Sequence, residues 1–173
     1  HVFGDVKVDS EEGAFASWEK TKAKEKAAQP DASILDGVPK GLPALQRAAR
    51  VLEKVTKVGF QWDDMKGPLE KVEEELAEMK TEVLALEKMK ASGSGVAGDA
   101  VESQRKKLES EIGDLFFTLC NVAYLMKVSP EDSLRSTLAR FESRFKHVER
   151  KLKEKGKTPD QSDLAEMDTF WNE

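Results

Sequence analysis

The sequence predicts an all-α fold, and three observations carry that prediction. Charged residues make up 35% of the 173 residues and aromatic residues only 7%, a balance that favours amphipathic helices. Gly and Pro gather at a few places and leave long stretches between them. Within those stretches apolar residues recur every three or four positions, which is the helical period. The length suits one domain with a sizeable core.

The N-terminal part is predicted to be a linker rather than part of the compact domain. An extended entry segment would lead into a polar helix that begins near Ser10 and ends at Pro30. The run PDASILDGVPKG then contains two prolines and two glycines, which is typical of a connection. We therefore expect a linker with a polar helix over residues 1–34 and a helical domain over residues 35–173.

Helix start and stop signals divide the domain into four helices and a short fifth. The Gly/Ser/Ala-rich loop ASGSGVAGDA lacks periodicity and should let the helices on either side fold back as a hairpin. The fourth helix is expected to turn an apolar stripe inward, including Leu134, Leu138 and Phe141. The expected helices span residues 42–58, 68–90, 101–127, 130–155 and 163–173.

Carboxylates spaced three residues apart occur on both helices of the expected hairpin. KVEEELAE carries Glu75 and Glu78, and EIGD carries Glu111 and Asp114. Glu78 and Glu111 lie about thirteen residues on either side of the turn, so at ~1.5 Å per residue the pairs come level. Facing carboxylates repel unless a cation lies between them, and magnesium prefers oxygen ligands and binds phosphates. Two solvated acidic faces that never meet remain the alternative.

Charge, cysteine content and the length of the apolar runs argue against several classes of function. The net charge of −5 gives no overall basic surface for stable nucleic-acid binding. The single cysteine, Cys120, cannot form a disulfide framework and favours a reducing compartment. No apolar run reaches the ~20 residues of a membrane span. We expect a cytoplasmic protein without membrane or stable nucleic-acid partners. Because the chain begins at His1 rather than Met, we expect a fragment or processed product, and an upstream organelle signal stays open.

Several motifs together resemble one known family. GVPKGLPALQRA, VGFQW, KVEEELAE, ESEIGDLFFTLCNVA, ARFESRF and EMDTFW are similar to the MazG nucleoside triphosphate pyrophosphohydrolases, in particular to the C-terminal half of the two-domain members. The resemblance covers about residues 35–173. It implies a four-helix-bundle-like all-α NTP pyrophosphatase fold whose helices pack in a homodimer or higher homo-oligomer. The loop ASGSGVAGDA is longer than is usual there, and only one acidic motif set is present.

The resemblance also implies an activity and its metal. The substrates would be nucleoside triphosphates (NTP or dNTP), hydrolysed to nucleoside monophosphate and pyrophosphate with Mg2+, or with Mn2+ as the alternative. The family's EExxE…ExxD motif maps onto five residues here. Glu75, Glu78, Glu111 and Asp114 would hold the metal, and Glu74 or Glu75 would take a proton from the attacking water.

Substrate binding is expected on the remaining polar positions. Lys107, Arg140 and Arg144 match positions that present cations to the triphosphate, although residue 140 is more often Lys in the family. Trp171 matches a base-stacking position, and Asn121, on the helical stripe of Glu111, is assigned to substrate binding with them. A non-catalytic or regulatory helical module for oligomerisation or nucleotide binding is the alternative function.

Overall fold

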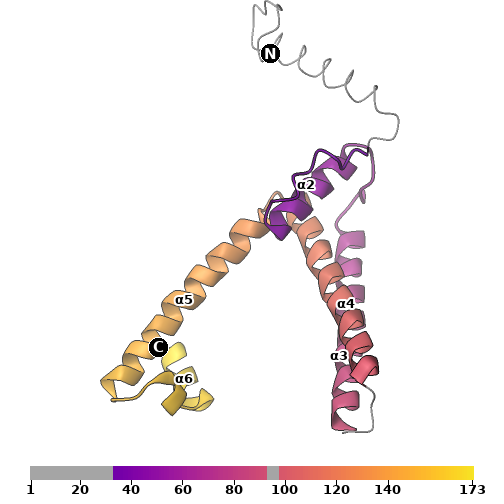
Figure 1. Cartoon of the computed structure of the whole chain (residues 1–173). Helices are drawn as coiled ribbons and strands as arrows, with labels where there is room; N and C mark the ends of the chain where they lie inside the picture. The colour runs from indigo at the N-terminus through magenta and orange to yellow at the C-terminus, as the bar shows by residue number, and fades with distance from the viewer. Residues whose placement is uncertain (1–32, 93–97) are drawn as a thin grey trace, which may run out of the picture. The chain divides into compact units, whose positions relative to one another are not determined.

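The computed structural model describes residues 33–92 and 98–173 (Figure 1). Every regular element within these residues is a helix, so the all-α prediction is confirmed. The chain divides into two compact units, His1–Pro39 and Lys40–Glu173, and all the helices described below belong to the second. The polar helix predicted near Ser10 lies outside the described residues. The boundary between residues 34 and 35 stays a prediction.

The predicted helices of the compact domain are all found, with their ends displaced by a few residues. The loop after the second helix is shorter than predicted, because that helix runs on to Ala91 and the next begins at Gly98. In chain order the elements are α2 (Ala44–Thr56), α3 (Lys66–Ala91), α4 (Gly98–Leu125), α5 (Pro130–Glu154), the 3-10 turn η2 (Pro159–Gln161) and α6 (Leu164–Trp171).

The hairpin predicted from the flexible loop is present, and α3 and α4 lie side by side in it (Figure 1). Its buried residues are unusually polar, because Gln104, Thr118 and Asn121 on α4 are buried beside Cys120. The Gln104 side-chain amide donates a hydrogen bond to the backbone oxygen of Glu82 across the pair at 3.2 Å, and also contacts the Glu82 carboxylate. The hairpin is therefore tied by specific polar contacts as well as by apolar packing.

The beginning of α3 is fixed by an aromatic contact. The indole of Trp62 lies against the backbone at Gly67, so closely that a side-chain methyl group at residue 67 would overlap the indole ring. Pro68 follows in the first turn and is buried, and proline is well tolerated there because its missing N–H has no helical partner. This contact sets the register at which α3 presents KVEEELAE, four residues further along.

The C-terminal arm, α5 with η2 and α6, has an apolar core of its own. Val148 and Leu152 of α5 pack with Phe170 of α6, all buried. Ser129 caps α5 by accepting a hydrogen bond from the backbone N–H of Asp132 at 3.2 Å. Gly156 ends the helix with a φ of +70°, a conformation that glycine adopts without strain. Local signals thus fix the beginning and the end of α5, and apolar packing holds α6 against it.

One prediction about α5 is wrong for the single chain. The apolar stripe on its first half was expected to turn inward, yet the structure leaves Leu134, Leu138 and Phe141 49%, 52% and 54% exposed. Among the described residues, α6 covers the second half of the helix and contacts Phe141 through Trp171, whereas the first half has few contacts with α4 and α2. Helical periodicity identified the stripe but carried no information about which element would cover it.

Across the described ranges no single helix has the length and apolar character needed to cross a membrane. The pair of α4 and α5, which bends by 107° at the break between the helices, meets a test of length and composition only when both are counted together.

Candidate functional site

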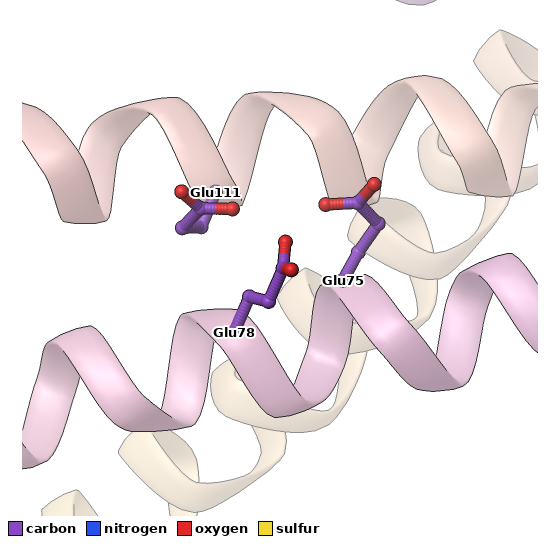
Figure 2. Close-up of side chains that lie close together, drawn as sticks. All are labelled: Glu75, Glu78 and Glu111. Carbon is purple, nitrogen blue, oxygen red and sulfur yellow. The ribbon is translucent and has the colours of Figure 1, made fainter.

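Three carboxylates meet between the two helices of the hairpin. Glu75 and Glu78 come from α3 and Glu111 from α4, and one oxygen of each lies within 4.8 Å of the others. Figure 2 shows the three side chains pointing toward one another across the gap between the helices. The predicted level match of the two helices is therefore confirmed for Glu78 and Glu111. We call these three residues the carboxylate cluster.

The three carboxylates differ in their surroundings. Glu75 is only 5% exposed, Glu111 is half-buried and Glu78 is exposed. Partial burial raises the pKa of the Glu111 carboxyl, and the negative charges of Glu78, Asp114 and Glu75 raise it further. A cation that enters between such crowded carboxylates reduces the electrostatic repulsion between them. The described residues therefore offer a set of hard oxygen donors that suits a divalent metal ion.

The fourth predicted metal ligand stands apart from the cluster. Asp114 lies nearly one turn further along α4 than Glu111, and its side chain is exposed. It is nevertheless close enough for its charge to raise the pKa of Glu111. Its role as a ligand stays a prediction.

A lysine neighbours the buried member of the cluster. The ammonium Nζ of Lys71 lies 2.7 Å from Oε1 of Glu75 and 3.1 Å from Oε1 of Glu74. Its pKa is well above the usual range, because it donates hydrogen bonds to Glu75 first and to Glu74 second. Glu74, one of the two predicted proton acceptors, keeps 56% of its side chain exposed. It thus lies at the rim of the cluster.

Two predicted substrate residues lie on α4 in different surroundings. Lys107 is exposed, one helical turn before Glu111. Asn121 is only 3% exposed, and its amide exchanges hydrogen bonds with the amide of Gln61. Gln61 donates to Asn121 Oδ1 at 2.8 Å, and Asn121 donates back to Gln61 Oε1 at 3.4 Å. This pair ties the connection between α2 and α3 to α4, so the visible contacts of Asn121 are structural.

The other predicted substrate residues lie on the C-terminal arm. The guanidinium carbon of Arg144 lies 5.6 Å from the ring centroid of Trp171, a favourable cation–π geometry. Both residues line a cavity of about 370 Å3 together with His147, Phe170, Asn172 and Glu173. Arg140 is exposed and donates hydrogen bonds to Ser136 and Thr137 of its own helix. The structure thus brings together Arg144 and Trp171 out of the five predicted substrate residues.

Some site residues escaped the sequence prediction. Lys71 is four residues before Glu75, the spacing at which opposite charges on a helix pair, so the sequence could have predicted this ion pair. The hydrogen bonds between Gln61 and Asn121 join residues 60 apart in sequence, and no local sequence pattern predicts them. His147 and Phe170 line the cavity because α6 folds back on α5, an arrangement that periodicity alone cannot fix.

Comparison with known proteins gives relatives along the whole chain, whereas no family model matches it. The chain is 34% identical over 173 residues to the "Nucleoside triphosphate pyrophosphohydrolase" of Escherichia coli K12, covering 100% of this chain and 60% of that protein. It is 32% identical over 171 residues to the "Nucleoside triphosphate pyrophosphohydrolase/pyrophosphatase MazG" of Thermotoga maritima, covering 99% of this chain and 57% of that protein.

A third relative places the same segment in a longer protein. The "Uncharacterized protein YabN" of Bacillus subtilis is 39% identical over 173 residues, all of this chain but only 32% of that protein. The chain therefore spans less than two thirds of the length of the curated relatives it matches. This full-chain similarity, together with the all-helical fold and the carboxylates brought together by α3 and α4, supports assignment of the chain to the MazG family.

Proposed function

We propose that this chain hydrolyses nucleoside triphosphates to nucleoside monophosphate and pyrophosphate. The observation that carries the proposal is the carboxylate cluster, formed between antiparallel helices at the motif predicted to hold a metal. The Escherichia coli and Thermotoga maritima relatives, both named nucleoside triphosphate pyrophosphohydrolase, support it. Because the chain spans only part of each relative, the activity is proposed for this chain rather than transferred to it.

The proposed metal is Mg2+, with Mn2+ as the alternative. Glu75, Glu78 and Glu111 supply oxygen donors within 4.8 Å of one another, and exposed Asp114 is a fourth donor on the same helix as Glu111. Hard divalent cations prefer such oxygen ligands. When bound, the metal would lower the pKa of a coordinated water and offset negative charge on the phosphates.

The remaining residues supply proton transfer and charge. We assign proton acceptance to Glu74 rather than Glu75, because Glu74 lies at the rim with 56% of its side chain exposed while Glu75 belongs to the cluster. Water would attack the α-phosphorus, Glu74 would take its proton, and the bond to the β-phosphate would break. Lys107, Arg140 and Arg144 would offset the charge that develops on the departing pyrophosphate.

Recognition of the base is proposed for the cavity on the C-terminal arm. Trp171 offers an aromatic surface and Arg144 a cation beside it, and rings of this kind stack on any nucleobase. Phe141 supports the indole, with ring centroids 5.1 Å apart and an angle of 52° between the planes. Such stacking tolerates every base, so we expect broad rather than strict base preference.

The proposed site requires a second copy of the chain. Glu111 lies fourteen residues before the end of α4, and Arg144 lies fourteen residues after the beginning of α5. At ~1.5 Å per residue each is about 21 Å from the bend between these helices. Because the chain bends by 107° between the two helices, the two residues are on the order of 25 Å apart, further than one nucleoside triphosphate reaches. We infer a homodimer in which one copy's arm approaches the other copy's carboxylate cluster.

Exposed apolar side chains support this assembly. Phe116 is 57% exposed on α4, and Leu138 and Phe141 are 52% and 54% exposed on α5. A stripe of exposed apolar side chains along one helix, such as Leu138 and Phe141 on α5, is typical of a protein interface. A second copy would bury the stripe that the single chain leaves open on α5.

A product assay tests the proposed reaction. The chain is incubated with a panel of NTPs and dNTPs and magnesium, and monophosphate and pyrophosphate are quantified with and without EDTA. We expect both products in equal amounts only when the divalent metal is present. Release of inorganic phosphate with nucleoside diphosphate, or no turnover of any nucleotide, would contradict the proposal.

Mixing two inactive variants tests the shared site. Glu78→Gln and the double variant Arg140→Ala/Arg144→Ala disable the carboxylates and the arm separately. If one site takes both parts from different copies, mixed dimers contain one intact site, and activity returns to about a quarter of the wild-type value at statistical mixing. A mixture as inactive as its components, with exchange of copies verified by mass, would rule out the shared site.

A further inference from the structure

Glu75 already has a cationic partner in the metal-free cluster. The Lys71 ammonium lies 2.7 Å from the Glu75 carboxylate, whose side chain is only 7% exposed. Figure 2 shows the Glu75 carboxylate directed toward Glu78 and Glu111. The carboxylate that faces the proposed metal position is therefore the one that the lysine neutralises.

A second lysine–glutamate pair on the same helix is longer and more exposed than the pair of Lys71 and Glu75. Lys66 and Glu70 have the same four-residue spacing, yet their charged atoms are 3.7 Å apart and their side chains are 78% and 65% exposed. Such a pair contributes little because water screens it. Lys71 is itself only 36% exposed, and its partner is removed from water, so its charge matters more.

Charge balance explains why Lys71 is needed when the metal is absent. A carboxylate removed from water requires a cation or hydrogen bonds to remain ionised. Lys71 supplies both to Glu75, with its ammonium 2.7 Å from the carboxylate. One ammonium offsets only one of the three cluster charges, so the cluster remains anionic.

We propose that Lys71 is a placeholder for the divalent cation, and that its ammonium must release Glu75 before the cation binds there. This inference rests on the proposed metal site. It adds that metal affinity is set by competition with an internal cation, so the protein binds metal more weakly than its carboxylates alone would. The competing possibility is that Lys71 stays in contact with one Glu75 oxygen while the metal takes the other.

Calorimetric titration of the metal-free chain with Mn2+ at fixed pH and ionic strength tests the placeholder. Lys71→Gln should bind Mn2+ about tenfold more tightly than wild type, which corresponds to one lost ion pair of moderate strength. Lys71→Arg, which keeps the cation, should stay within about threefold of wild type. The matched control is Lys66→Gln, which removes the same charge from a screened pair and should change the dissociation constant less than about twofold.

Thermal unfolding gives a second readout that needs no turnover. In EDTA, Lys71→Gln should melt below wild type, because Glu75 loses its counter-charge. Saturating Mn2+ should raise its Tm by more than it raises that of wild type. If Lys71→Gln does not fold in EDTA, the double variant Lys71→Gln/Glu74→Gln replaces it. This variant keeps the net charge of wild type, and its expected result is again tighter binding.

The outcomes separate the two proposals. If wild type binds no divalent cation, the proposed metal site fails. If wild type binds Mn2+ and Lys71→Gln binds it equally or more weakly, the metal site stands and the placeholder is overturned. Tightening in Lys66→Gln equal to that in Lys71→Gln would also overturn it, because the effect would then reflect net charge alone.

Discussion

The α3–α4 hairpin and the α5–α6 arm are both helix pairs, yet among the described residues only the hairpin buries several polar side chains beside its apolar ones. The hairpin buries Glu75, Gln104 and Asn121. The arm buries an apolar cluster and keeps its cations at the surface, with Arg144 beside Trp171. Polar groups buried in a hairpin need specific partners, whereas an apolar cluster needs only volume and shape.

The contrast teaches how one small chain provides two complementary chemistries. The hairpin concentrates negative charge where a metal ion would bind, and the arm provides positive charge and an aromatic surface where a nucleotide would bind. In the proposed homodimer, contact between two copies would bring the arm of one copy to the carboxylate cluster of the other.

The largest effect should come from breaking the hairpin's carboxylate cluster. Glu78→Gln keeps the volume of the exposed side chain and removes its charge, so we expect pyrophosphate release to fall by about 100-fold or more while the helix content is unchanged. Glu73→Gln, on an exposed position of the same helix, is the matched control. Equal rates for the two variants, measured with circular dichroism spectra alongside, would refute the cluster's role.

A smaller effect is expected on the arm. Arg144→Ala removes the guanidinium beside Trp171, and we expect KM for nucleoside triphosphates to rise about tenfold through lost phosphate contact. Arg135→Ala, on α5 but paired with Glu131 at 3.5 Å, should leave KM close to wild type. If Arg144→Ala changed neither KM nor kcat, the proposed contact of the arm with the nucleotide would be contradicted.

The contact that sets the start of α3 should affect stability rather than chemistry. Gly67→Ala adds a methyl group that overlaps the Trp62 ring, which should cost about 1–3 kcal/mol as overpacking does elsewhere. Gly41→Ala is the control, since nothing lies within 4 Å of a methyl group there. Urea unfolding measures both, and an unchanged midpoint for Gly67→Ala would show that the indole can move away freely.

The smallest effect concerns pH and the docking of α6. Lys157, then Ser162 and Lys155, hold the pKa of Glu166 at about 2, against an ordinary value of 4.5. A lowered folded pKa stabilises the fold above pH 4.5, and the contribution disappears as pH falls toward 2. Glu166→Gln should therefore be less stable than wild type near neutral pH, and the difference should shrink across this range. A difference independent of pH in thermal melts would contradict this account.

The helices and the carboxylate hairpin were predictable because their signals are local. The spacing of apolar residues predicts the helices, and the signals at Ser129 and Gly156 mark the two ends of α5. Glu78 and Glu111 are equally distant from the turn, which brings them level across the hairpin. The apolar face around Leu138 was predicted as buried and is not, since covering a stripe depends on another element or another chain. The pairing of Gln61 with Asn121 depends on a contact between distant segments, which local patterns do not encode.

Electron paramagnetic resonance of Mn2+ tests the central claim most directly, because it reports bound metal without requiring turnover. Titration of the metal-free chain should show saturable binding in wild type and in Glu73→Gln, with loss of binding in Glu78→Gln and in Glu111→Gln. That pattern would assign one metal site to carboxylates from both α3 and α4. Retained binding in both cluster variants, or loss that follows only one helix, would contradict a site formed between the two.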